Sequence, residues 1–130
     1  MPFIQFNNIS KEYRGCISCQ EVNLEVQAST IHAVVGENGA GKSTLMKIWG
    51  GLVIPTTGYM ILRDQKYFPS SALDAFKNKI AFIHQHFVLA RQLTAFENIL
   101  LSSSSSLNPL AKIPREAIRE KTEAFLKKFH

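Results

Sequence analysis

A glycine-rich stretch at residues 36–44 combines small residues, one amine and two hydroxyls: Gly36-Glu37-Asn38-Gly39-Ala40-Gly41-Lys42-Ser43-Thr44. This stretch matches the pattern G-x-x-x-x-G-K-[ST] in full. Glycines let the backbone take left-handed turns and approach a ligand closely, and successive N–H groups then form an anion-binding concavity. The Lys42 amine would reach the β- and γ-phosphates of a nucleotide, and the Ser43 hydroxyl would hold Mg²⁺. The pattern therefore predicts a phosphate-binding loop.

Such a loop needs a strand before it and a helix after it. Residues 30–35 are nearly all apolar, which predicts a strand covered on both faces of a sheet. After the loop, apolar residues recur with helical spacing and predict a buried stripe: Leu45, Ile48, Trp49 and Leu52. Gly50 and Gly51 predict a left-handed stop to this helix.

The rest of the chain carries further strand and helix signals. Apolar or alternating runs predict strands at residues 3–9, 21–27, 59–62 and 79–83. Two capping boxes, from Ser71 to Asp74 and from Thr94 to Glu97, predict helix starts. The serine-rich residues 102–113 predict a flexible connection, and a last helix is expected over residues 114–130.

Composition limits the functional classes. The chain has 130 residues and a net charge of +5, which fits one domain with an anionic ligand. Its basic residues are mixed with acids and lack an aromatic platform, so no nucleic-acid partner is expected. No apolar run is long enough to span a bilayer, and no signal peptide is recognisable. Cys16 and Cys19 lack a second pair for zinc, and we expect reduced thiols in a surface turn.

Three classes of phosphate-loop protein compete at this point: a transport-type ATPase, a GTPase switch and a small-molecule kinase. A GTPase needs a guanine-reading N-K-x-D, whereas the nearest string is Asn78-Lys79-Ile80-Ala81. The loop alone leaves the kinase open.

Residues on both sides of the loop resemble those of ATP-binding-cassette (ABC) transporter ATPases, in their N-terminal part. The resemblance runs over about residues 3–101, and is carried by the loop and three strings: Pro55-Thr56-Thr57-Gly58, His84-Gln85-His86-Phe87 and Leu93-Thr94-Ala95-Phe96-Glu97-Asn98-Ile99. It implies an α/β P-loop NTPase fold, with a mixed sheet, an antiparallel β-subdomain and the start of a helical subdomain. The implied divisions are residues 1–101, the connection at 102–113, and the first part of a helical subdomain at 114–130.

The resemblance also implies roles for single residues. Tyr13 takes the place of the aromatic residue that stacks on adenine. The ATP-binding residues of the loop would be Gly36, Asn38, Gly39, Ala40, Gly41, Lys42, Ser43 and Thr44. Gln85 would join Ser43 in coordinating Mg²⁺ and would position the attacking water, so Lys42 and Gln85 are the catalytic candidates. His84 and His86 are expected to be structural.

The implied function is that of the ATP-binding subunit of an importer of simple sugars or nucleosides. Its partners would be transmembrane permease subunits and a second ATPase domain in a head-to-tail dimer, on the cytoplasmic face of the cell membrane. Two elements that hydrolysis requires, a strand ending in Asp-Glu and a Leu-Ser-Gly-Gly-Gln signature, are not in the sequence. We therefore expect an incomplete domain with weak nucleotide affinity and negligible turnover by itself. The alternatives are a nucleotide-binding remnant without turnover and a P-loop small-molecule kinase.

Overall fold

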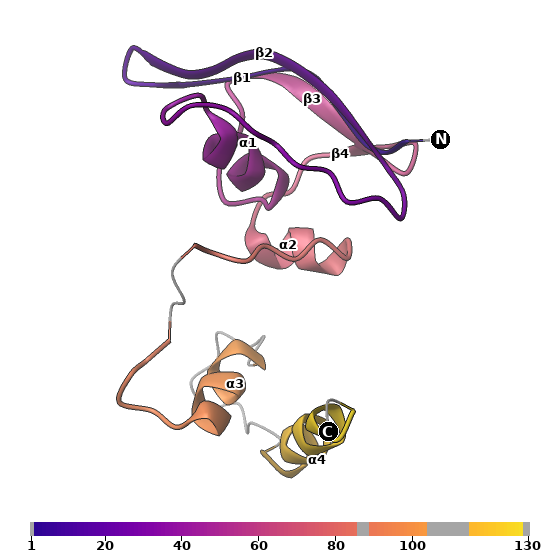
Figure 1. Cartoon of the computed structure of the whole chain (residues 1–130), viewed down its shortest axis with the longest axis vertical. Helices are drawn as coiled ribbons and strands as arrows, with labels where there is room; N and C mark the ends of the chain where they lie inside the picture. The colour runs from indigo at the N-terminus through magenta and orange to yellow at the C-terminus, as the bar shows by residue number, and fades with distance from the viewer. Residues whose placement is uncertain (1, 86–88, 104–114, 129–130) are drawn as a thin grey trace. The chain divides into compact units, whose positions relative to one another are not determined.

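The computed structural model describes residues 2–85, 89–103 and 115–128. The chain divides into two compact units, Met1–Ile83 and His84–His130. The first unit contains a sheet and two helices, and the second contains two further helices (Figure 1).

The first unit is built on a four-stranded antiparallel sheet. Its strands are β1 (Pro2–Tyr13), β2 (Cys16–Gln27), β3 (Thr57–Leu62) and β4 (Gln65–Tyr67), in the order β2-β1-β3-β4. The strands predicted at 3–9, 21–27 and 59–62 are confirmed, and β1 and β2 are longer than expected because they pair with each other over most of their length. The alternation in β2 is also confirmed, since Val26 is buried while its neighbours Glu25 and Gln27 are exposed.

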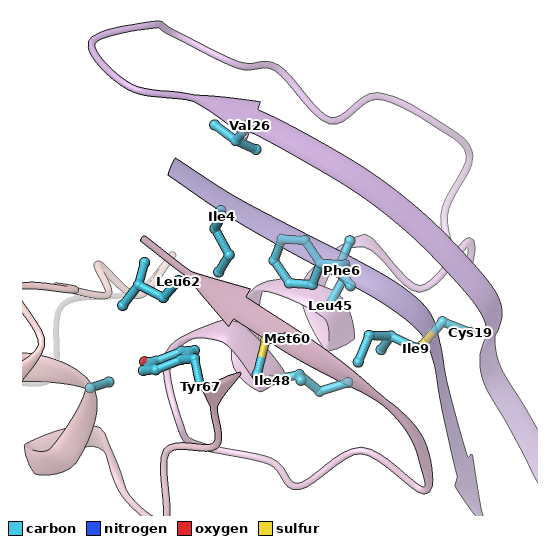
Figure 2. Packing of buried hydrophobic residues seen from close by; sticks show 11 residues of the cluster. Ile4, Phe6, Ile9, Cys19, Val26, Leu45, Ile48, Met60, Leu62 and Tyr67 are labelled. Carbon is cyan, nitrogen blue, oxygen red and sulfur yellow. The ribbon is translucent and has the colours of Figure 1, made fainter. Parts of the chain in front are cut away.

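Helix α1 (Lys42–Trp49) lies against the sheet (Figure 1), and its buried residues are Leu45 and Ile48. Leu45 and Ile48 join a buried cluster that is otherwise formed mainly by strand residues (Figure 2): Ile4, Phe6, Ile9, Cys19, Val26, Met60, Leu62 and Tyr67. The rings of Phe6 and Trp49 meet edge to face, with centroids 5.8 Å apart. This cluster fixes the helix on one face of the sheet, and the helix in turn fixes the end of the loop that precedes it.

Of the two glycines predicted to stop α1, Gly51 takes the left-handed conformation and Gly50, with a φ of −75°, does not. Gly51 has a φ of 70°, and its N–H donates to the carbonyl oxygen of Ile48 over 3.1 Å. Leu52 falls beyond the helix and is 40% exposed, so the buried stripe ends at Trp49. The Tyr67 hydroxyl donates to the carbonyl oxygen of Trp49 over 3.0 Å. Burial, with a smaller contribution from the nearby Asp74 carboxylate, raises the pKa of Tyr67 to about 12.

Two predicted strands are wrong. Residues 30–35 and 79–83 have no strand structure, and the side chains of Ile31, Val35 and Ile83 are 103%, 87% and 83% exposed. Both runs are apolar enough for a sheet interior, but a strand also needs a neighbouring backbone with which to form hydrogen bonds. Neither run is a strand of the sheet in the part of the chain that the structure describes.

The expectation for the cysteines also needs correction. Cys16 and Cys19 are free thiols on strand β2, not in the turn at residues 14–15 that precedes it. Cys16 is exposed, but Cys19 is 7% exposed and belongs to the apolar cluster. Burial raises the pKa of the Cys19 thiol.

Both predicted helix starts are confirmed, and the second is a full capping box. At the first, the Asp74 carboxylate accepts the N–H of Ser70 over 3.1 Å, not the N–H of the cap residue Ser71 that a capping box would use. Ser71 caps α2 (Ala72–Lys77) by accepting the N–H of Asp74 over 3.2 Å. Ahead of α3 (Ala95–Ser103), Thr94 donates its N–H to the Glu97 carboxylate over 2.8 Å, and its hydroxyl accepts the N–H of Glu97 over 3.2 Å. These reciprocal bonds satisfy amide groups that a helix start leaves without a partner.

The second unit continues with α4 (Arg115–Leu126), which lacks any buried residue among those described. Helix α3 extends to Ser103, so the first two residues of the predicted connection at 102–113 are helical. The remainder of that connection, together with Pro114 and residues 129–130, lies outside the described residues. In the part of the chain that the structure describes, no helix has the length and apolar character needed to cross a membrane.

Candidate phosphate-binding site

The glycine-rich loop forms an exposed turn directly before α1. Residues 36–40 are all exposed, and the N–H of Ala40 donates to the carbonyl oxygen of Glu37 over 3.2 Å. Gly39 and Gly41 have φ values of 85° and 84°, the left-handed conformation that glycine adopts without strain. The predicted helix after the loop is therefore confirmed, whereas the chain before the loop is not a strand.

The start of α1 is open toward this loop. Its N-cap residue is Gly41, and no side chain in the described structure provides a capping hydrogen bond. The first bond of the helical pattern joins the N–H of Leu45 to the carbonyl oxygen of Gly41 over 2.9 Å, so the amides of Lys42, Ser43 and Thr44 lie outside that pattern. The first turn contains no acidic residue. These amides and the positive end of the helix dipole suit an anion.

The Lys42 amine lies over the beginning of the loop. Its Nζ donates to the carbonyl oxygens of Gly36 and Glu37, over 2.7 Å and 2.6 Å. These bonds fold the lysine side chain back along the loop, whose last glycine is the N-cap of the helix. The loop and the helix start that follows it thus offer both a positive charge and N–H donors, which fits the polyphosphate of a nucleotide.

Strand β2 forms a wall behind the last glycine of the loop. A side-chain carbon added at Gly41 would lie 2.3 Å from the carbonyl oxygen of Ser18 and 3.0 Å from the Cβ of Cys19. Glycine is therefore required at position 41 both by its positive φ and by this close approach. In the first turn of the helix, the Thr44 hydroxyl forms a hydrogen bond of 2.7 Å with the hydroxyl of Ser18 on β2.

Tyr13 and Gln85 lie in different parts of the chain. Tyr13 is the last residue of β1, and its ring is 44% exposed with the Lys11 amine 5.1 Å from the ring centroid. Gln85 is an exposed residue at the start of the second unit. The roles predicted for these two residues, toward adenine and toward Mg²⁺, stay predictions.

The sequence patterns do not indicate two features of this site. Glu37 takes part through its backbone carbonyl, which any residue at that position would offer to Lys42. Ser18 and Cys19 enter through strand pairing some twenty residues before the loop. The capping-box and loop patterns report local chain geometry, and contacts between distant segments leave no such periodic signal.

A glycine-rich loop that opens directly onto an uncapped helix is the local arrangement of a phosphate-loop nucleotide-binding protein, although the strand expected before the loop is not formed in the described residues. Comparison with known proteins makes this assignment more specific. The chain belongs to the ABC transporter family, whose sequence model matches residues 19–130. The fold is that of an ATP-binding cassette, since a nucleotide-free cassette from an ABC transporter superposes with a TM-score of 0.79 at 22% identity. That match covers 98% of this chain and 55% of the cassette.

Two other relatives are informative. The ribose import ATP-binding protein RbsA of Chelativorans sp. (strain BNC1) is 41% identical over 115 residues, which cover 88% of this chain and 23% of that protein. A dimeric ATP-binding cassette in a post-hydrolysis state, bound to ADP and Pi, has a TM-score of 0.67 and 26% identity, covering 92% of this chain and 54% of that one. The chain thus spans about a quarter of the length of the import protein it matches.

Proposed function

We propose that these 130 residues are the nucleotide-binding part of the ATPase subunit of an ABC importer for a small solute such as a simple sugar or nucleoside. The observation that carries this proposal is the Lys42 amine, held 2.7 Å and 2.6 Å from two carbonyls of a loop that opens onto the uncapped start of α1. The solute class is supported by the similarity to a ribose import ATP-binding protein.

Each residue would contribute a distinct interaction with ATP. The amides of the loop and of the first turn of α1 would bind phosphate oxygens, and Lys42 would neutralise part of their charge. The Ser43 hydroxyl and the Gln85 side-chain oxygen are hard ligands of the kind that Mg²⁺ prefers. When bound, Mg²⁺ would neutralise the charge that develops on the phosphates during transfer to water.

The adenine would stack on Tyr13. The exposed ring is available for stacking, which needs no specific pattern of hydrogen-bond donors. Because the Lys11 amine already lies over the ring at 5.1 Å, we expect the base to use the opposite face.

The partners follow from the same proposal. Import requires permease subunits in the membrane, so the subunit would lie on the cytoplasmic face of the cell membrane. A second ATPase domain would pair with it, as supported by the dimeric cassette to which this chain is similar.

The test is the affinity of the complete polypeptide for a non-hydrolysable ATP analogue with Mg²⁺. Lys42→Ala should weaken binding between about tenfold and a hundredfold, because it removes a charge-assisted contact to phosphate. Lys47→Ala is the matched control, since Lys47 is an exposed lysine in the last turn of the same helix. Equal affinity for the unmodified protein and the Lys42 variant would contradict the proposal.

A further inference from the structure

Ser18 is the extra residue of a β-bulge that faces the phosphate-binding loop. Glu12 and Lys11 are adjacent on β1, but they pair with Ile17 and Cys19, which are two residues apart on β2. Ser18 therefore has no partner across the ladder. A bulge of this kind turns a side chain away from the regular alternation of the strand, and bulges are enriched next to functional sites.

The bulge directs Ser18 toward α1. Its hydroxyl lies 2.7 Å from the hydroxyl of Thr44, and both side chains are partly buried. The carbonyl oxygen of the same residue forms the wall behind Gly41. Ser18 thus contacts the end of the loop through its backbone and the first turn of the helix through its side chain.

The direction of the hydroxyl bond decides what Thr44 can offer to a ligand. If Thr44 donated to Ser18, only oxygen lone pairs would remain to face an anion. If Ser18 donates to Thr44, the Thr44 proton is free for a phosphate oxygen, and each bond of the chain strengthens the next. An anion at the positive end of α1 favours the arrangement in which Ser18 donates to Thr44.

We propose that Ser18 is a positioning residue for nucleotide binding, which holds the Thr44 hydroxyl as a donor to phosphate. This inference rests on the proposed function, because it requires a nucleotide at the loop. It adds a residue from β2 that the loop motif does not contain.

The test is a double-mutant cycle on the complete polypeptide, with ADP and Mg²⁺ as the probe and isothermal titration calorimetry as the measurement. Ser18→Ala should weaken ADP binding about threefold to tenfold, as expected for one neutral hydrogen bond. In a Thr44→Val background, Ser18→Ala should cause no further loss, because the group it orients is gone. Ser18→Thr keeps a hydroxyl and should retain most of the affinity.

The remaining outcomes overturn the inference. If Ser18→Ala lowers the melting temperature without nucleotide but leaves ADP affinity unchanged, Ser18 is only structural. If Ser18→Ala causes the same loss of ADP affinity with threonine and with valine at position 44, Ser18 does not act through Thr44. These results are distinct from failure of the proposed function, in which the unmodified protein itself would not bind ADP or would be insensitive to Lys42→Ala.

Discussion

The two units of the molecule are stabilised in different ways. The first has a continuous apolar cluster formed by the sheet, α1 and α2, with several side chains fully buried. In the described residues of the second unit, Leu100 is the one buried apolar side chain, and α4 has none. Hydrogen bonds at the start of α3, and the Arg119 guanidinium 5.5 Å from the centre of the Phe96 ring, are the clearest interactions there. The comparison shows that capping can define where a helix begins without a buried core around it.

The largest expected effect comes from the core of the first unit. Ile9→Ala removes a fully buried side chain of β1 and should lower the free energy of unfolding by about 2–5 kcal/mol. Ile31→Ala is the matched control, because the same atoms are removed from a fully exposed position, and its effect should stay within about 0.5 kcal/mol. Denaturant unfolding of the 130-residue chain, followed by the fluorescence of its single tryptophan, measures both. Similar losses for the two variants would mean that residues 30–35 are buried in solution.

A smaller effect is expected from the Tyr67 hydroxyl at high pH. Its pKa is raised from 10 to about 12 in the folded state, so its contribution to stability is complete below pH 10 and is lost as the pH rises to about 12. Tyr67→Phe should cost about 1 kcal/mol at neutral pH, since the bond to Trp49 is lost. The variant should also lose less stability than the unmodified chain between pH 10 and 12. Parallel pH curves for the two proteins would contradict this assignment.

The smallest effect should be confined to the second unit. Hydrogen bonds from Thr94, through its N–H and its hydroxyl, lower the pKa of Glu97 below 4.5. The contribution of Glu97 is therefore present above pH 4.5 and is lost as the pH falls through its lower folded value. Amide hydrogen exchange should show α3 opening more readily at low pH.

Thr94→Ala removes the hydroxyl half of this capping box at neutral pH and should weaken α3 by about 0.5–2 kcal/mol. Exchange of the β1 and β2 amides serves as the internal control, because the first unit has its own core. If acid or Thr94→Ala increased exchange equally in both units, their stabilities would be coupled and the comparison would fail.

Local patterns predicted much of the fold. They predicted helix α1, its stop at Gly51, the starts of α2 and α3, and three strands. Each of these signals comes from residues that are close together in the sequence. The same kind of pattern failed at residues 30–35 and 79–83, where apolar runs lack a paired strand. Hydrophobicity indicates that a segment can be buried, but the backbone partner that makes it a strand lies elsewhere in the chain.

The candidate site divides in the same way. The lysine and the helix start could be predicted because the motif places them within nine residues. The hydroxyl pair of Ser18 and Thr44 could not, because it depends on a bulge in a strand pair. The register between two strands decides which residue lies in a bulge, and the preferences of single residues do not encode this register.

The contact behind Gly41 also limits how this protein can change by mutation. The atom that blocks a side chain there is the main-chain oxygen of residue 18, 2.3 Å from where that carbon would lie. Every amino acid carries this oxygen, so no replacement on β2 could make room for a larger residue in the loop. No substitution at position 18 could therefore compensate for a larger residue at position 41. The side chain at position 18 does not block position 41, so only ligand binding limits which residue stands there.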